Sequence, residues 1–234
     1  MQPYLFPYIG YFQLINKVET LILHDNIQYV KRSWINRNRL RNSEKGADFF
    51  TLPLERSSNY HDIVKKRIHE KEFIKFKSRL INRVKNNYSK ADYFIEGLEI
   101  LENCLAHRSN NLFDFLHNSI VKTLDYLRID TSILISSKIS IDHSLKAQDK
   151  VIELCKASDC TEYWNVYAGY ELYDFKDFNK YNIKLNFIEP SQSIFYNQRS
   201  SNFIPDLSIL DVIMNNSIDQ VKDLLKQYKV KKSL

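Results

Sequence analysis

Residues 36–39, which read Asn-Arg-Asn-Arg, are the densest run of groups able to hold an anion. The guanidinium of arginine forms two parallel hydrogen bonds to a phosphate or carboxylate, and asparagine offers a donor and an acceptor to a sugar hydroxyl or a base edge. In an extended segment Arg37 and Arg39 share one face, while Asn36 and Asn38 share the other. The run predicts an anion clamp with polar contacts beside it, and a basic surface strand is the alternative.

Asp25 and His24 follow the apolar run at residues 21–23. A strand ending there brings them to its carboxyl end, the usual ligand edge of an open α/β sheet. A carboxylate can act as general base or hold a hydroxyl, and histidine titrates near neutral pH. Adjacent strand residues point to opposite faces, so we expect only one of the two at a given site. The alternative is an Asp25 that merely caps a turn.

The first residues form an aromatic block punctuated by proline. Residues 2–13 contain Pro3, Pro7, Gly10 and the rings of Tyr4 and Tyr8. Proline fixes φ and removes a backbone donor, so the block predicts a shaped loop that leads into a helix at residues 11–18. Loops of this kind commonly carry ligand sites in α/β proteins.

A third polar patch lies near the end of the chain. Pro205 and the apolar residues after it predict a loop that opens a buried helix, with Asp206 or Ser208 as its cap. Tyr196, Gln198 and Asp211 carry polar groups in this patch, so they are candidate binding residues.

The elements that must position these groups alternate between strand and helix. We expect strands at residues 21–23, 49–52, 131–135, 162–166 and 183–188, and helices at residues 62–87, 111–127, 147–156 and 217–228. Ser109 or Asn110 is the expected cap of the helix at 111–127. This order predicts an α/β fold with a mixed or mostly parallel sheet, a large helical middle section and a C-terminal helix. We expect one domain over residues 1–234, with residues 60–130 as a candidate helical subdomain.

Composition narrows the class of protein. The net charge of +6 is spread among acidic residues, which does not indicate a nucleic-acid partner, and the basic tail at 229–232 is expected to be a solvated end. Three cysteines without a close pair, and histidines without ligand spacing, indicate neither a disulfide framework nor a metal site. No leader and no apolar run of spanning length is evident, so we expect a cytoplasmic protein without a membrane span.

At these patches the chain resembles the WbqC-like protein family of bacteria. Residues 2–12 look like the opening signature of that family, and Asp25, Gln28 and Tyr29 with residues 31–39 look like its second. Residues 163–173 and 203–211 also resemble the family. Its members usually carry a short apolar strand ahead of the glutamine–proline pair, which here follows Met1 directly. Residues 164–171 replace a version richer in glycine and proline, so contacts made there, for example by Asn165, are expected to be specialised.

The resemblance implies a setting of O-antigen (lipopolysaccharide) and related surface-polysaccharide biosynthesis. The expected activity is transfer of an acyl or aminoacyl group to the amino group of a nucleotide-linked deoxyamino sugar. Asp25 or His24 would be the general base, and Arg37 and Arg39 the phosphate clamp. Asn36, Asn38 and Gln28 would contact the sugar, and Trp34, Tyr4 and Tyr8 would stack on the nucleobase. The full set of expected binding residues is Gln2, Tyr4, Tyr8, Gln28, Trp34, Asn36, Arg37, Asn38, Arg39, Asn165, Tyr196, Gln198 and Asp211.

No phosphate-cradling glycine loop identifies a tightly bound cofactor, and a thioester donor such as coenzyme A or an acyl-carrier protein fits the reaction. Two alternatives stay open: a covalent acyl-enzyme route through Cys155 or Cys160, and a non-catalytic module that binds a nucleotide sugar or a partner enzyme. The sequence leaves a homo-oligomer open.

Overall fold

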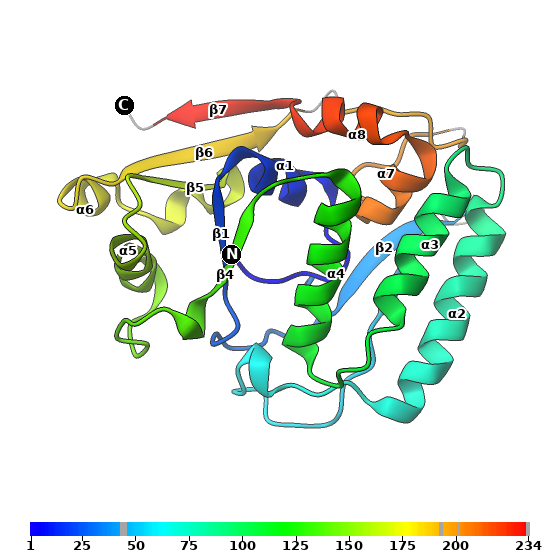
Figure 1. Ribbon diagram of the computed structural model, residues 1–234, viewed down its shortest axis with the longest axis horizontal. Coiled ribbons are helices and arrows are strands. Elements are labelled where there is room, and N and C mark those ends of the chain that lie inside the picture. The colour runs from blue at the N-terminus through cyan, green and yellow to red at the C-terminus, as the bar shows by residue number, and fades with distance from the viewer. Residues whose placement is uncertain (43–45, 192–193, 201, 233–234) are drawn as a thin grey trace.

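The structure, a computed structural model, describes residues 1–42, 46–191, 194–200 and 202–232. Its helices and strands follow one another along the chain as Figure 1 shows. The α-helices are α1 (Ile9–Lys17), α2 (Glu70–Tyr88), α3 (Phe94–Leu105), α4 (Leu112–Leu127), α5 (Ala147–Ala157), α6 (Phe175–Asn179), α7 (Ile209–Asn215) and α8 (Ile218–Leu225). The strands are β1 (Thr20–Leu23), β2 (Arg37–Asn42), β3 (Gly46–Thr51), β4 (Ser132–Ile135), β5 (Glu162–Val166), β6 (Lys184–Pro190) and β7 (Tyr228–Lys232).

These strands form three small sheets. β1 pairs with β4 in parallel, β2 pairs with β3 antiparallel, and β5 and β6 are parallel with β7 added antiparallel to β6. The predicted α/β class with mixed pairing is therefore confirmed, although the strands are divided among three sheets. Each parallel pair is joined through helices, as parallel crossovers require.

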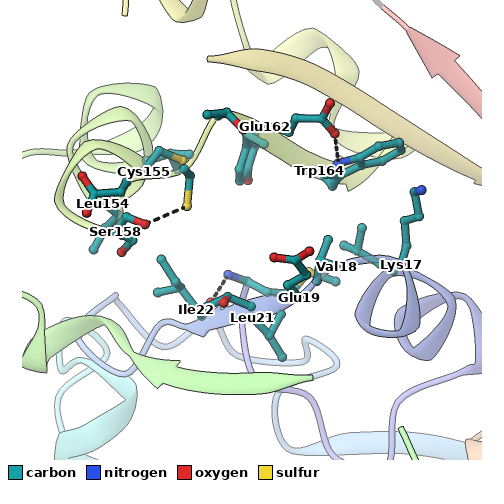
Figure 2. Close-up of a pocket in the computed structure, with 18 of the residues that line it drawn as sticks. Lys17, Val18, Glu19, Leu21, Ile22, Leu154, Cys155, Ser158, Glu162 and Trp164 are labelled. Atoms are coloured by element: carbon teal, nitrogen blue, oxygen red, sulfur yellow. Dashed lines mark hydrogen bonds between the residues drawn. The ribbon is translucent and has the colours of Figure 1, made fainter. Parts of the chain in front are cut away.

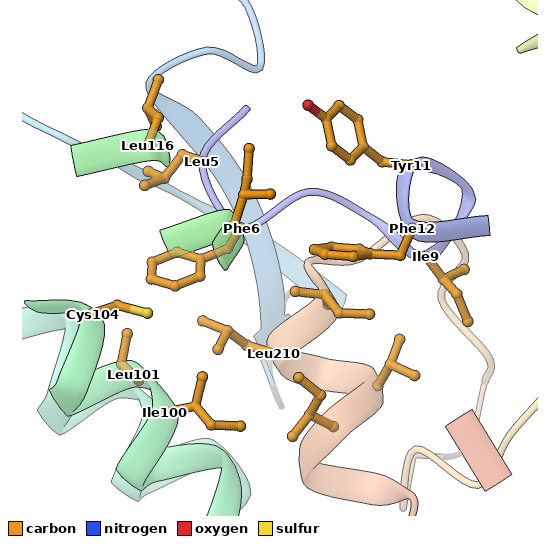
Figure 3. Close-up of a cluster of buried hydrophobic side chains, with 14 of the residues drawn as sticks. Leu5, Phe6, Ile9, Tyr11, Phe12, Ile100, Leu101, Cys104, Leu116 and Leu210 are labelled. Atoms are coloured by element: carbon orange, nitrogen blue, oxygen red, sulfur yellow. The ribbon is translucent and has the colours of Figure 1, made fainter. Parts of the chain in front are cut away.

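The larger hydrophobic core lies under the aromatic opening block. Leu5, Phe6 and Phe12 are almost fully buried and pack with residues of α3, α4 and α7 (Figure 3). Burying these large side chains removes apolar surface from water, at about 2 kcal/mol for each of them. The predicted loop is thus anchored by its buried residues Leu5 and Phe6, and the helix that follows begins two residues earlier than expected, at Ile9.

A second, smaller core lies under the β5–β6–β7 sheet, at the opposite side of the molecule from α2 and α3 (Figure 1). Phe178, Phe187, Leu185 and Ile183 are its most buried members, and Ile152 and Cys155 of α5 pack with them. The smaller of the two cavities described below is lined by residues of both cores.

Three local expectations are wrong. Asn111 caps α4 by accepting a hydrogen bond from the Asp114 amide, in place of Ser109 or Asn110. Residues 228–232 form β7, whereas we expected a solvated tail, because the edge of β6 offers backbone partners to an extended segment. α3, which packs against α2, α4 and α7, was not foreseen. In the part of the chain described, no helix has both the length and the apolar character needed to cross a membrane.

Candidate functional site

The three patches singled out in the sequence meet at one cavity of about 750 Å³. This volume is in the range of small-molecule sites. We call it the aromatic cavity. Its lining residues are Tyr4, Pro7, Tyr8, Ile9, Trp34, Asn38, Val166, Ala168, Pro190, Ser191, Ile194, Tyr196, Phe203, Pro205, Asp206, Leu207 and Val212.

The opening block supplies one wall because some of its residues face the core and others face the cavity. Leu5 and Phe6 are buried, and Tyr4 and Tyr8 face the cavity. Phe6 has a φ of 43°, a left-handed conformation that costs a bulky residue about 1 to 3 kcal/mol. Its carbonyl is held by Asn38 Nδ2 at 2.7 Å and by Ser208 Oγ at 2.9 Å, so residues far apart in sequence fix this turn.

Gly10 is required by the ring of Tyr8. A Cβ at Gly10 would lie 2.4 Å from Cε2 of Tyr8, closer than real contacts allow. The glycine of the opening motif therefore lets the Tyr8 ring lie against the first turn of α1.

The hydroxyl groups of the wall are protonated at neutral pH. Burial, reinforced by the negative charge of Asp206 and by Tyr4, raises the pKa of Tyr8 to about 12. Burial also raises the pKa of Tyr4. The cavity thus presents tyrosine donors close to one carboxylate, Asp206, whose backbone has a φ of 55°.

Trp34 and Arg39 lie at the rim. The Trp34 side chain is 40% exposed, and the Arg39 guanidinium lies 5.9 Å from the centre of its ring. Arg39 donates to the carbonyls of Pro205 and Asp206 at 3.2 and 3.3 Å. Arg37 lies over the ring of Phe49, outside the cavity. As predicted, Arg37 and Arg39 share one face of β2, while Asn38 is buried on the other.

The two asparagines mainly hold backbone. Asn36 accepts from the Tyr29 hydroxyl and donates to the Leu52 carbonyl, and it is not part of the cavity lining. Asn38 lines the cavity, but its Nδ2 group donates to the carbonyls of Leu5 and Phe6. These interactions occupy the groups that the sequence assigned to a ligand.

Tyr196, Gln198 and Asp211 form a buried network behind the cavity wall. Asp211 is fully buried and accepts hydrogen bonds from Tyr88 at 2.7 Å, Tyr196 at 2.6 Å and Gln198 at 3.1 Å. Burial raises the pKa of Asp211, against the lowering effect of these donors. Gln198 also pairs with the amide and carbonyl of Ile204, so the network fixes the loop that carries Phe203 and Asp206. Of the three, only Tyr196 reaches the cavity.

The expected base residues lie elsewhere. Asp25 comes directly after β1, as predicted, and its carboxylate accepts from Ser136 Oγ, Ser137 Oγ and the Ser137 amide at 2.6 to 3.0 Å. His24 is largely buried, and burial with the positive charges of the α-amino group and Lys150 lowers its pKa to about 2. Neither residue lines the aromatic cavity, and their catalytic roles stay predictions.

The remaining candidates are dispersed. Gln28 is exposed and donates to the Asn59 carbonyl, remote from the cavity lining. Gln2 contacts the wall from behind, since its side chain accepts from the Tyr4 hydroxyl at 3.4 Å. Asn165 donates to the hydroxyls of Tyr163 and Tyr173 and directly precedes the lining residue Val166.

A second cavity of about 490 Å³ lies between β1 and β5 (Figure 2). Cys155, Cys160, His24 and the α-amino group of Met1 line it. Burial raises the pKa of Cys155 to about 12 and also raises that of Cys160, so both thiols are protonated at neutral pH. Across the residues that the structure covers, no group of histidine, cysteine and acidic side chains could hold a metal ion.

Two contributors to the cavity were missed in the sequence. Asp206 was considered only as a helix cap, although its place after Pro205 in a left-handed turn is a signal for an outward-facing side chain. Pro190, the last residue of β6, reaches the cavity only in the folded chain, whereas Ala168 belongs to residues 164–171, where contacts were expected. No periodic pattern in the sequence predicts such contacts.

Fold and cavity together define a mixed α/β protein with one aromatic-walled, small-molecule-sized site. The chain belongs to the WbqC-like protein family, which it matches over residues 2–223. It is 26% identical over 211 residues to the uncharacterized protein Rv1507c of Mycobacterium tuberculosis, with 89% of each chain covered. No solved structure matches the chain.

Proposed function

We propose that the protein forms an amide on the amino group of a nucleotide-linked deoxyamino sugar, as a step in bacterial surface-polysaccharide biosynthesis. The observation that carries the proposal is that all four family-like segments contribute to the lining of the aromatic cavity, for example through Tyr8, Trp34, Val166 and Asp206. We place the sugar in this cavity. We place the reaction in the cytoplasm, where both the nucleotide sugar and the thioester would be present as substrates.

The wall chemistry suits an amino sugar. Aromatic rings pack on the apolar faces of a sugar, and the hydroxyls of Tyr4 and Tyr8 can donate to its oxygens. The Asp206 carboxylate near Tyr8 can hold the ammonium group and accept its proton. We therefore assign Asp206, in preference to Asp25 or His24, as the group that faces the amine.

The reaction balances with a thioester donor. The amine nitrogen attacks the thioester carbon, the C–N bond forms, and the C–S bond breaks. The proton leaves the nitrogen through Asp206 and reaches the departing thiolate, so the products are an amide and a free thiol. Tyrosine donors can stabilise the oxyanion formed on the way.

The test is to incubate the protein with a panel of nucleotide-linked amino sugars and acyl or aminoacyl thioesters, and to look for the mass of an amide. Asp206→Asn is expected to lower kcat by about 100-fold or more. Asp130→Asn is the matched control, because Asp130 is exposed and makes no contact with the cavity. Product from wild type with unchanged kcat in Asp206→Asn would remove Asp206 from the mechanism.

A binding-only module is the second candidate. It is favoured by the state of Asp25, whose carboxylate is engaged by Ser136 and Ser137 outside the cavity. Tight binding of a nucleotide sugar in calorimetry, with no amide from any pair of substrates, would support this candidate over the enzyme.

A further inference from the structure

We infer that the outer face of the β2–β3 hairpin binds the nucleoside diphosphate part of the substrate, outside the aromatic cavity that takes the sugar. This inference rests on the proposed function for the identity of the whole ligand. The site consists of Trp34, Arg37, Arg39 and Phe49, and we call it the hairpin face.

The antiparallel register places these groups together. Arg39 pairs directly with Phe49, and Arg37 pairs with Thr51, so their side chains lie on the same side of the hairpin. The rings of Trp34 and Phe49 are 5.9 Å apart and remain 40% and 48% exposed. The hairpin face is therefore an open aromatic platform between two arginines.

The two guanidinium groups have spare donors. The Arg37 guanidinium lies 4.6 Å from the centre of the Phe49 ring, and the side chain makes no hydrogen bond or ion pair with any residue that the structure describes. Its Nε atom is buried without a partner, as is that of Arg39. A buried donor without a partner is unfavourable, and an anion bound at this place would satisfy it.

The spacing suits a diphosphate. Side chains two residues apart on a strand are about 7 Å apart, and each guanidinium can take a phosphate by two parallel hydrogen bonds. Stacking of the arginines on the rings fixes the planes of their donors. A nucleobase can stack on the exposed ring surface beside them.

The hairpin face continues into the aromatic cavity. Trp34 belongs to both, and Arg39 donates to the carbonyls of the cavity residues Pro205 and Asp206. A nucleotide sugar bound across this rim would place its phosphates at the arginines and its sugar among the tyrosines. An acidic ligand without a nucleobase would leave the aromatic rings of the hairpin face unused.

Calorimetry with UDP, dTDP, GDP and inorganic pyrophosphate tests the inference. Arg37→Ala is the informative variant, because the Arg37 side chain supports no other described residue by hydrogen bonding. We expect its Kd for the preferred nucleoside diphosphate to rise about 10-fold or more. Arg56→Ala removes an equal charge from an exposed position outside the hairpin face, and its Kd is expected to match wild type.

Two further variants test the contribution of the nucleobase to binding separately from that of the phosphates. Phe49→Leu is expected to raise the Kd for the nucleoside diphosphate about 5-fold and to leave that for pyrophosphate within 2-fold. Trp164→Phe leaves Trp34 as the single tryptophan of a chain that has two, so nucleotide binding is expected to quench the remaining fluorescence. Unchanged fluorescence at saturation would overturn the placement beside Trp34.

The outcomes distinguish this inference from the proposed function. Amide formation with Kd and KM unchanged in Arg37→Ala overturns the hairpin face and leaves the enzyme intact. Nucleotide binding that depends on Arg37, with no amide from any pair of substrates, supports the hairpin face as a nucleotide site and contradicts the proposed amide-forming activity. Tight binding of a 12-nucleotide dT strand, with no binding of any nucleoside diphosphate, overturns the inference in favour of a nucleic-acid surface.

Discussion

Asn38 holds the backbone of Phe6 in its left-handed turn, with Nδ2 donating to the Phe6 carbonyl at 2.7 Å. The same Nδ2 group donates to Leu5 at 3.0 Å. An asparagine that the sequence offers as a ligand contact thus shapes the wall of the cavity. The relationship predicts a stability effect that can be measured without knowing the substrate.

Asn38→Ala is expected to lower the free energy of unfolding by about 2 to 4 kcal/mol, since it leaves two buried carbonyls with fewer donors. Urea denaturation measures the change. Asn86→Ala, at an exposed position of α2, is the control and is expected to stay within about 0.5 kcal/mol of wild type. Equal stability of the two variants would mean that the Phe6 turn does not depend on Asn38.

Gly10→Ala is expected to displace the Tyr8 ring, because the new methyl group would lie only 2.4 Å from Cε2. The ring is the end of a side chain that can rotate, so the fold is expected to survive with a smaller or altered cavity. Affinity for a nucleotide-linked amino sugar should fall about 10-fold while the nucleoside diphosphate retains its Kd. Calorimetry with both ligands checks this, and a parallel loss of both affinities would contradict it.

The lowered pKa of His24 predicts that the folded protein loses stability in acid. The folded-state pKa of His24, about 2, is below the unfolded value of 6.5, so only the unfolded chain takes up the proton between these pH values. Stability should therefore fall as pH decreases below 6.5, by up to about 1.4 kcal/mol per pH unit from this group.

Urea denaturation at pH 7, 6 and 5 measures that slope. His24→Gln removes the titrating group and should flatten the curve, whereas His143→Gln, at an exposed position, should leave it unchanged. A slope that is the same in wild type and His24→Gln would exclude His24 as its source.

Cys155→Ala is expected to leave amide formation unchanged. The thiol has a pKa of about 12 because it is buried, and it lies in the second cavity, apart from the proposed sugar site. A turnover assay measures the effect, and mass spectrometry after brief iodoacetamide treatment should find Cys155 unmodified in the native protein and modified in urea. Lost turnover with an acyl group attached to Cys155 in wild type would restore the covalent route.

The sequence by itself determined the local helices and strands and the polar side chains that are candidates for a site. Alternation at residues 36–39 was sufficient to assign Arg37 and Arg39 to one face, because the period of a strand is a local property. The apolar run before Asp25, the capping box of α8 and the proline before α7 likewise act over a few residues.

Only the tertiary structure decided which polar groups remain available to a ligand. Asn36, Asn38, Gln198 and Asp211 look like binding residues in the sequence, and each is engaged by backbone or buried partners in the fold. The partners come from residues up to 33 positions from Asn38 and 123 from Asp211. A buried polar group takes whichever partner the packing brings, so its role depends on the distant segments that surround it.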